Sequence, residues 1–340
     1  MTRPVRFGLW YDFRNPPEWR IPFGDMYRTY LDQIVAAEKQ GFNSVWLTEH
    51  HFCDDGYTPS PFVIAAAIGA RTEKMHIGFN LMILPLHDPI RIAEDAATLS
   101  LLTGGRFDLG VGLGYRQLEF DAFNRNLKNR PSLMEESIEI IRRAWAGETV
   151  NFTGKRFVVG DHKITPQPEK RPRILMGGMS EPAIDRVARI GDGFLSTGGI
   201  GEEMYIEALA RHGKDPKEGC IVAGSWALIS PDPIAEAKRV APHVLYQSNK
   251  YIEWGAFGPP ETTPLYKDAT QALAEGLYTV WTAEQAIESI ATLLDKFPQM
   301  EDIHFWAQLP GEPIEQGQAR VDYIASEVLP ALRKMGYVAP

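Results

Sequence analysis

Few of the features that mark secreted, membrane-bound or nucleic-acid-binding proteins are present in this sequence. Only two of its 340 residues are cysteines, Cys53 and Cys220, so no disulfide framework is expected and a reducing compartment suits the composition. The N-terminal residues contain no apolar signal segment, and no later run reaches the length of about 18 apolar residues that spans a membrane. With 35 basic against 44 acidic side chains, the net charge of −9 argues against a nucleic-acid or anionic-membrane surface. We expect a cytoplasmic protein.

Two further absences concern domains and cofactors. The chain has no internal repeat, low-complexity segment or evident linker, which predicts a single domain over residues 1–340. It also lacks the GxGxxG fingerprint of nicotinamide-binding proteins, because Gly110, Gly112 and Gly114 in GVGLG are spaced differently. Glycines at the end of a strand indicate instead that the backbone approaches another group closely, such as a planar ligand.

The main feature that is present is an alternation of strands and helices. Short apolar segments typical of buried strands occupy residues 5–11, 42–47, 76–84, 106–112, 173–178, 192–197, 220–229 and 302–308. Segments typical of helices occupy residues 25–40, 61–72, 90–102, 132–146, 180–191, 201–212, 233–250, 282–296 and 318–334. Asp25 and Asp88 are expected to cap two of these helices. Eight alternating units with mostly short links predict a closed (β/α)8 barrel, an α/β fold.

Two stretches are too long to be simple connections in such a barrel. Residues 147–171 carry glycine, proline and aromatic side chains and are expected to form an extended excursion. Residues 231–281 follow the seventh strand, so they should lie on the C-terminal face, where the active sites of such barrels are found. Within them, residues 250–270 include Trp254 and Phe257. We expect this part to be either a lid over a substrate or a stabilising excursion.

The strand at residues 42–47 leads directly into the sequence Glu49-His50-His51. A carboxylate and two imidazoles at the C-terminal end of a buried strand are typical of an α/β active site. They could also be polar residues that merely close the strand. Imidazole titrates near neutral pH, so a histidine here can hold or move a proton. A metal site built from these histidines with Cys53 and Asp54 is disfavoured, because neighbouring side chains on a strand diverge.

Several longer segments together resemble the bacterial luciferase-like flavin-dependent monooxygenases. The segments are GFNSVWLTEHHF, IGFNLMILPLHDP, GGRFDLGVGLGYRQLEFDAF, RRAWAGETVNFTGKRF and ILMGGMSEPAIDRVARIGDGF, and the resemblance runs nearly from end to end. It implies a (β/α)8 TIM barrel with an insertion after the seventh strand. It also implies the use of reduced flavin, and a homodimer that is formed by the helices at 61–72 and 89–102.

The resemblance also implies roles for individual residues. His50 would be the catalytic residue at the reactive edge of the flavin, Glu49 would orient it or line the pocket, and His51 would be mainly structural. A non-prolyl cis peptide between Asn80 and Leu81 would lie beneath the flavin ring. A turn at the start of a helix would bind the flavin phosphate through backbone N–H groups. The expected cofactor-binding residues are Glu49, Asn80, Leu81, Gly112, Tyr115, Arg130, Gly177, Gly178, Met179 and Ser180.

The reaction that these features favour is an FMN-dependent monooxygenation. Reduced FMN, supplied by a separate flavin reductase, and O2 would oxidise a small organic substrate. Trp10, Trp254, Phe257 and Trp306 suggest that this substrate is apolar. Two alternatives stay open. One is a deazaflavin-dependent dehydrogenase that transfers hydride without O2, although EHHF resembles the FMN branch. The other is a flavin-binding protein without turnover.

Overall fold

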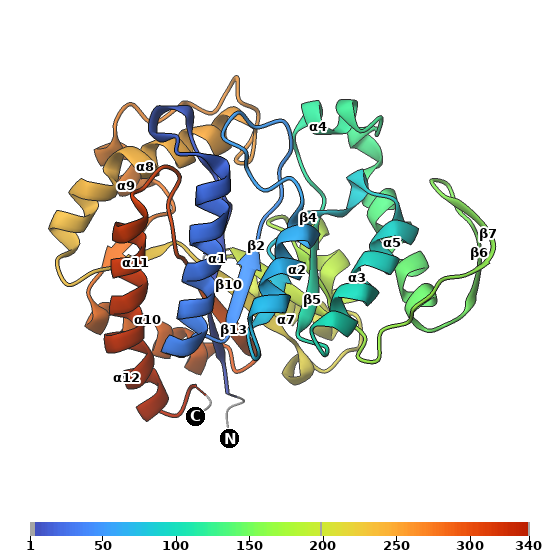
Figure 1. Ribbon diagram of the computed structural model, residues 1–340. Helices are drawn as coiled ribbons and strands as arrows, with labels where there is room; N and C mark the ends of the chain where they lie inside the picture. Colours follow the sequence, from blue (N-terminus) through green and yellow to red (C-terminus); the bar gives the residue numbers. More distant parts are fainter. Residues whose placement is uncertain (1–3, 198, 339–340) are drawn as a thin grey trace.

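A closed barrel of eight parallel strands forms the centre of the protein (Figure 1). The computed structural model describes residues 4–197 and 199–338. Pairing of β3 with β5 and of β1 with β13 completes the ring. The predicted (β/α)8 barrel is therefore confirmed. In order, its strands are β1 (Arg6–Tyr11), β2 (Ser44–Leu47), β3 (His76–Phe79), β5 (Phe107–Gly112), β8 (Ile174–Gly177), β9 (Gly193–Thr197), β10 (Ile221–Ser225) and β13 (Met300–Trp306).

Helices surround the barrel, so its strands are buried on both sides. Their sequences are therefore continuous apolar runs. Within the described ranges, no helix combines the length and apolar character that a membrane crossing requires. The surrounding helices are α1 (Phe23–Gln40), α2 (Pro61–Arg71), α3 (Pro89–Leu102), α5 (Arg130–Trp145), α6 (Glu181–Ile190), α7 (Glu202–Arg211), α10 (Ala283–Lys296), α11 (Ile314–Tyr323) and α12 (Leu329–Lys334). A π-helical turn, Ile324–Val328, joins the last two, and short 3-10 turns occupy Pro17–Trp19, Leu84–Leu86, Leu127–Asn129 and Pro216–Glu218.

One of the two expected helix caps is confirmed and the other is wrong. The Asp88 carboxylate accepts the N–H groups of Ile90 at 2.9 Å and Arg91 at 3.3 Å, as an N-cap should. Asp25 does not cap α1, because this helix already begins at Phe23 and places Asp25 inside the first turn.

Two expected strands are interrupted at the C-terminal end of the barrel. The segment at 76–84 forms β3 and then, after the Asn80–Leu81 peptide, β4 (Met82–Ile83). The Asn80–Leu81 bond is cis, as the resemblance implied. The segment at 220–229 divides at Trp226 into β10 and β11 (Ala227–Ile229), and β11 leaves the barrel to pair with β12 (Thr279–Trp281).

The two expected excursions have defined structure. Residues 147–171 contain an antiparallel hairpin, β6 (Thr149–Thr153) and β7 (Val158–Lys163), which projects at the right of Figure 1. Residues 231–281 contain β12, α8 (Pro233–Glu253), which is longer than expected, and α9 (Ala269–Glu275). Both helices lie at the C-terminal face, at the upper left of Figure 1, and the unexpected short helix α4 (Gln117–Ala122) lies at the upper right.

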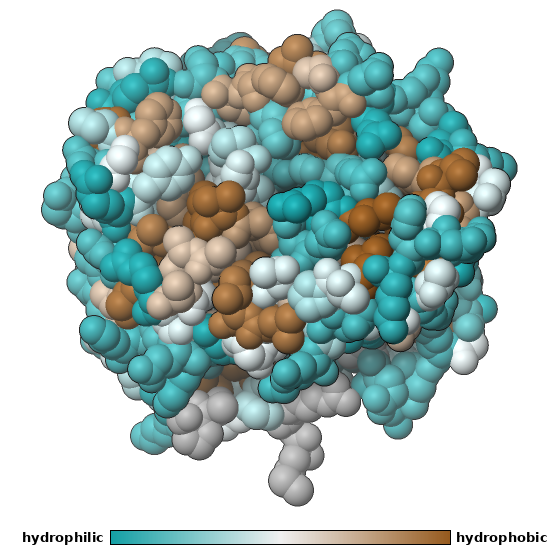
Figure 2. All heavy atoms as spheres, turned by 45° about the vertical axis from the view of Figure 1, so that its right-hand side comes forward, coloured by the Kyte–Doolittle hydropathy of each residue, from teal (hydrophilic) through white to brown (hydrophobic). Residues whose placement is uncertain are grey.

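Exposed apolar side chains on α2 and α3 agree with the expected dimer contact, which stays a prediction. The two helices pack against each other. Val63 on α2 is 70% exposed and Leu102 on α3 is 68% exposed. Figure 2 shows apolar patches among polar atoms on the side of the molecule that it views.

Candidate active site

His50 lies at the centre of a buried hydrogen-bonded chain at the C-terminal end of β2. Its Nδ1 is 2.8 Å from Oε1 of Glu119, and its Nε2 is 3.0 Å from the hydroxyl oxygen of Tyr115. An ionised carboxylate only accepts hydrogen bonds, so Nδ1 carries the proton and Nε2 accepts from Tyr115. Burial lowers the pKa of His50 below its usual value, against the opposing effect of Glu119. The imidazole is therefore neutral near pH 7 and has a basic nitrogen.

Glu119 is the carboxylate that orients His50. It lies on α4, is completely buried, and also accepts the backbone N–H of His51 at 2.9 Å and an Nη1–H of Arg116 at 3.0 Å. Burial alone would raise the pKa of Glu119, but the bonds from His50, His51 and Arg116 bring it below the usual value. The expectation that Glu49 might orient His50 is wrong. Sequence reasoning missed Glu119, whose signal is the three-residue spacing from Arg116 in YRQLEF, directly after the glycines.

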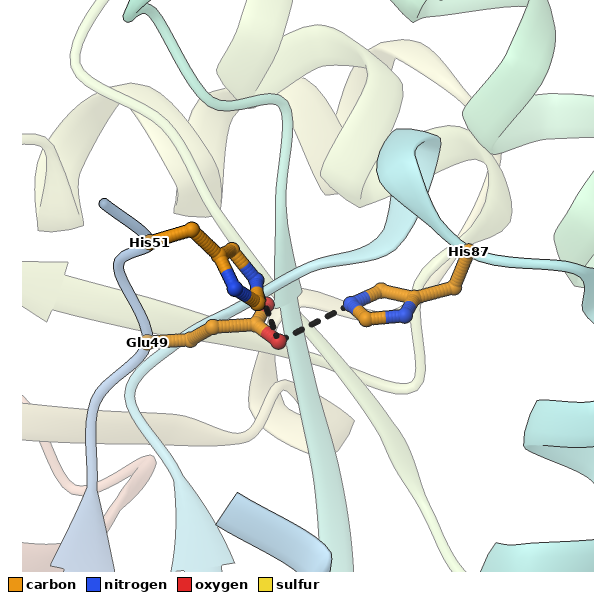
Figure 3. Close-up of side chains that lie close together, drawn as sticks. All are labelled: Glu49, His51 and His87. Carbon is orange, nitrogen blue, oxygen red and sulfur yellow. Dashed lines mark hydrogen bonds and ion pairs between the residues drawn. The ribbon is translucent and has the colours of Figure 1, made fainter. Parts of the chain in front are cut away.

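Glu49 points to the other side of the chain, toward His51 and His87 (Figure 3). Its Oε1 lies 2.9 Å from Nε2 of His87 and 3.4 Å from Nε2 of His51. Its Oε2 accepts the backbone N–H of Ile83 at 2.5 Å. Although burial opposes the charged forms, the pairing holds the pKa of Glu49 well below its usual range and raises that of His87. Glu49 and His87 therefore form an ion pair that fixes the segment after β3.

Glu49, His51 and His87 are also three side chains of kinds that can bind a metal. Their ligand atoms all lie within 4.8 Å of one another. Such sets of imidazole and carboxylate ligands suit zinc and other divalent ions. Here an ion would have to replace the proton shared by Glu49 and His87 and compete with the Ile83 N–H for the carboxylate.

The metal site considered from the sequence, built from His50, His51, Cys53 and Asp54, does not form in the described part of the chain. Within residues 4–197 and 199–338, the trio above is the one metal-ligating group of this kind. His50 faces Glu119 and Tyr115 instead. The thiol of Cys53 lies 3.1 Å from Nη1 of Arg116.

The residues that were expected to lie beneath the cofactor ring surround the Asn80–Leu81 peptide. The carbonyl oxygen of Asn80 accepts the indole N–H of Trp10 at 3.2 Å, and its amide nitrogen is 3.0 Å from Nε2 of His304. Leu81 lies against Gly112 and Gly177, where an added Cβ would be only 2.5 Å from a Leu81 methyl carbon. Of the three glycines that were expected to admit a planar ligand, Gly112 thus makes room for Leu81, whereas Gly110 faces the Phe79 carbonyl and Gly114 faces Ile83. Leu81 is itself partly exposed, so its side chain can contact the ring of a flavin or a deazaflavin.

The turn from Gly177 to Ser180 fits the anionic end of such a cofactor. It immediately precedes α6, and Gly178 packs against Ala183 of this helix. Met179 is 54% exposed, Ser180 is exposed, and within the described residues the Ser180 hydroxyl makes no capping hydrogen bond. An exposed turn at the start of a ten-residue helix offers N–H groups and a favourable dipole to an anion.

Arg130 is brought to the same end of the fold as this turn. It is the first residue of α5, and α5 and α6 are held side by side by ion pairs of Glu135 with Arg186 at 2.8 Å and Arg189 at 2.7 Å. Glu135 and Arg186 are each five residues from the start of their helix. The two helix N-termini therefore lie at the same level, and Arg130 can assist in binding an anion there.

The aromatic side chains that were expected to line an apolar pocket occupy different places in the structure. Trp10 and Trp306 are buried and stack at 4.3 Å between ring centroids inside the barrel. Trp254, at the end of α8, lies with its ring centroid 5.2 Å from that of His50 and 4.4 Å from the guanidinium carbon of Arg116. Phe257 is 45% exposed and borders a cavity of about 180 Å³. The segment expected to be a lid thus places one aromatic ring over His50.

Comparison with known proteins places these features in a family. The model of the luciferase-like monooxygenase family matches residues 5–296. An F420-dependent glucose-6-phosphate dehydrogenase of Microbacterium testaceum is 35% identical over 216 residues, which cover 62% of this chain and 61% of that protein. One of Kribbella flavida is 26% identical over 325 residues, 91% of this chain and 95% of that protein. Several other such relatives are matched over 54–57% of their length.

Solved structures resemble this chain in fold. The monooxygenase RslO1 from Streptomyces bottropensis has a TM-score of 0.80 and 23% identity, and the match covers 96% of this chain and 99% of that one. At this identity the likeness concerns the fold alone.

Proposed function

The chain belongs to the luciferase-like monooxygenase family, and within this family we propose that it is a deazaflavin-dependent dehydrogenase. It would move a hydride between coenzyme F420 and a carbon that bears a hydroxyl or carbonyl oxygen. The curated relatives, which are F420-dependent dehydrogenases, support this alternative better than the FMN-dependent monooxygenase that EHHF favoured. The observation that carries the proposal is the buried chain of Glu119, His50 and Tyr115.

This chain of residues suits the removal of a proton from a hydroxyl group. When bound, a deazaflavin supplies two-electron chemistry, the acceptance or donation of a hydride. A substrate hydroxyl that displaces the Tyr115 hydroxyl would donate to Nε2 of His50, which accepts the proton as hydride leaves the carbon. Glu119 keeps the ring in the correct tautomer and stabilises the imidazolium that forms. In the reverse direction the same imidazolium returns the proton to a carbonyl oxygen.

The cofactor would be held at both of its ends. Leu81, packed on Gly112 and Gly177, would contact the ring, while the turn at Gly177–Ser180 and Arg130 would bind the phosphate. The ring would then lie at the ends of β3, β5 and β8, the part of the barrel next to His50. Glu49 would act indirectly, because its bonds fix the segment that follows Leu81.

Equilibrium binding of the two cofactors tests the proposal. Quenching of cofactor fluorescence should give an F420 affinity at least tenfold above that of FMN, a difference of about 1.4 kcal/mol. Replacing Ser180 by Asp should weaken F420 binding, while Glu139→Gln on the exposed face of α5 should not. Tight binding of FMN with no measurable binding of F420 would overturn the deazaflavin assignment.

The monooxygenase stays the second candidate because of the EHHF segment itself, in which an imidazole lies beside the expected flavin site. It requires reduced FMN from a separate flavin reductase, O2 and an organic substrate. Oxygen consumption that depends on substrate and on reduced FMN would favour it. A flavin-binding protein without turnover is disfavoured, because the proton-transfer chain from Glu119 to Tyr115 is intact.

A further inference from the structure

Arg14, directly after β1, carries buried hydrogen-bond donors that have no acceptor. Its side chain is fully buried, and its Nε donates to Oδ2 of Asp55 at 2.6 Å. Its Nη1 and Nη2 are also buried and, in the described part of the chain, make no hydrogen bond. A guanidinium is always charged, and leaving its donors buried without partners is costly. Such an edge is suited to a ligand that supplies the missing acceptors.

We propose that the free edge of Arg14 binds a carboxylate of the substrate. Nη1 and Nη2 form the end of the guanidinium fork, which matches the two oxygens of a carboxylate in a bidentate pair. Asp55 already neutralises the Arg14 charge in part, and Asp12 accepts the Arg14 backbone N–H at 3.2 Å. The charge on Asp55 disfavours a doubly charged phosphate, so a single negative charge fits best.

The surroundings of Arg14 connect it to the catalytic histidine. Its guanidinium carbon lies 4.9 Å from the ring centroid of Trp254 and 5.2 Å from that of Tyr57. The same two rings lie 5.2 Å and 4.8 Å from the ring centroid of His50. The Trp254 and Tyr57 rings therefore each lie close to both Arg14 and His50. Tyr246 and Tyr251 complete the enclosure at 5.1 Å and 5.8 Å.

Arg14 also borders a cavity whose lining includes neither His50 nor Trp254. Its volume is about 650 Å³, and Trp19, Tyr30 and His243 are among its lining residues. This size is typical of sites for small organic ligands. Together these features indicate a substrate with one carboxylate and an apolar body. If the proposed function holds, on which the reaction rests, the substrate is a hydroxy acid.

The test compares benzoate with benzamide, which has nearly the same shape but no charge. Calorimetric titration of the natural protein, with and without added F420, should give at least tenfold tighter binding of benzoate. Arg14→Gln should reduce this preference to less than about threefold, a loss of at least 0.7 kcal/mol. Arg28→Gln, which removes an exposed arginine on α1, is the matched control and should keep it. Phenyl phosphate should bind more weakly than benzoate.

A second variant and a second titration replace the first experiment if Arg14→Gln fails to fold. The double variant Arg14→Gln with Asp55→Asn removes both charges of the buried Arg14–Asp55 pair and should also lose the preference for benzoate. Equal binding of benzoate and benzamide to the natural protein, or tight benzoate binding by the double variant, would overturn the inference. F420 titration of the same samples separates the two proposals: lost F420 binding with an intact benzoate preference would refute the proposed function and leave the Arg14 site standing.

Discussion

Replacing Glu119 by Gln probes the residue that gives His50 its proposed role. The substitution keeps the size of the side chain but removes the charge that accepts the His50 Nδ1–H at 2.8 Å. A hydrogen bond to a charged group contributes about 1.5–3 kcal/mol. If that contribution is lost when the imidazolium forms, kcat falls roughly 10- to 150-fold.

The pH profile distinguishes this positioning role from a general loss of structure. Glu119 raises the pKa of His50, which burial lowers. Without Glu119 the pKa of His50 falls further, so the acidic limb of kcat/KM should move to lower pH. Steady-state rates of F420 reduction across pH 4–9 would record both effects. Glu139→Gln should behave as the natural protein, and a Glu119→Gln enzyme with unchanged kcat and an unshifted limb would refute the reasoning.

Three further predictions concern packing, pH and the cofactor. Gly112→Ala should lower the free energy of unfolding by about 1–3 kcal/mol in urea titration, because its Cβ would overlap Leu81; adding Leu81→Ala should restore part of the loss, and an additive effect would contradict this. His87→Gln should be more destabilising near pH 6 than near pH 9. Glu49 raises the pKa of His87 in the folded protein, although burial opposes this. The ion pair therefore contributes its full stabilisation below the pKa of His87 in the unfolded chain, about 6.5, and this stabilisation is lost as pH rises through the folded pKa. An equal loss at both pH values would contradict the ion pair. Ser180→Asp should weaken F420 binding at least tenfold, about 1.4 kcal/mol, through repulsion of the phosphate; unchanged affinity would move that site elsewhere.

Local sequence signals were sufficient for the barrel because its strands and helices have clear periodicity. The alternation of apolar runs with amphipathic segments predicted all eight barrel strands, and the Asp88 cap follows from neighbouring residues alone. The β6–β7 hairpin was not predicted, because its alternating strand pattern is short and mostly exposed. The Asp25 cap failed because α1 starts after Pro22, without a capping side chain.

The site was only partly predictable because its key contacts join distant segments. His50 could be selected from the end of a strand, but its partner Glu119 lies 69 residues later on a six-residue helix. The interactions of Glu49 with His87, and of Leu81 with Gly112 and Gly177, also depend on how the barrel brings loops together. No local pattern distinguishes these contacts from ordinary surface or core positions.

Anaerobic turnover of reduced F420 tests the central claim most directly. Protein loaded with reduced F420 is mixed without O2 with a panel of keto acids and neutral ketones, and the reappearance of oxidised F420 is followed by its absorbance. Hydride transfer assisted by His50 predicts reoxidation by at least one carbonyl compound without O2, slowed about 10²- to 10⁴-fold in His50→Gln. Reoxidation that requires O2, or turnover that occurs with reduced FMN alone, would contradict the account.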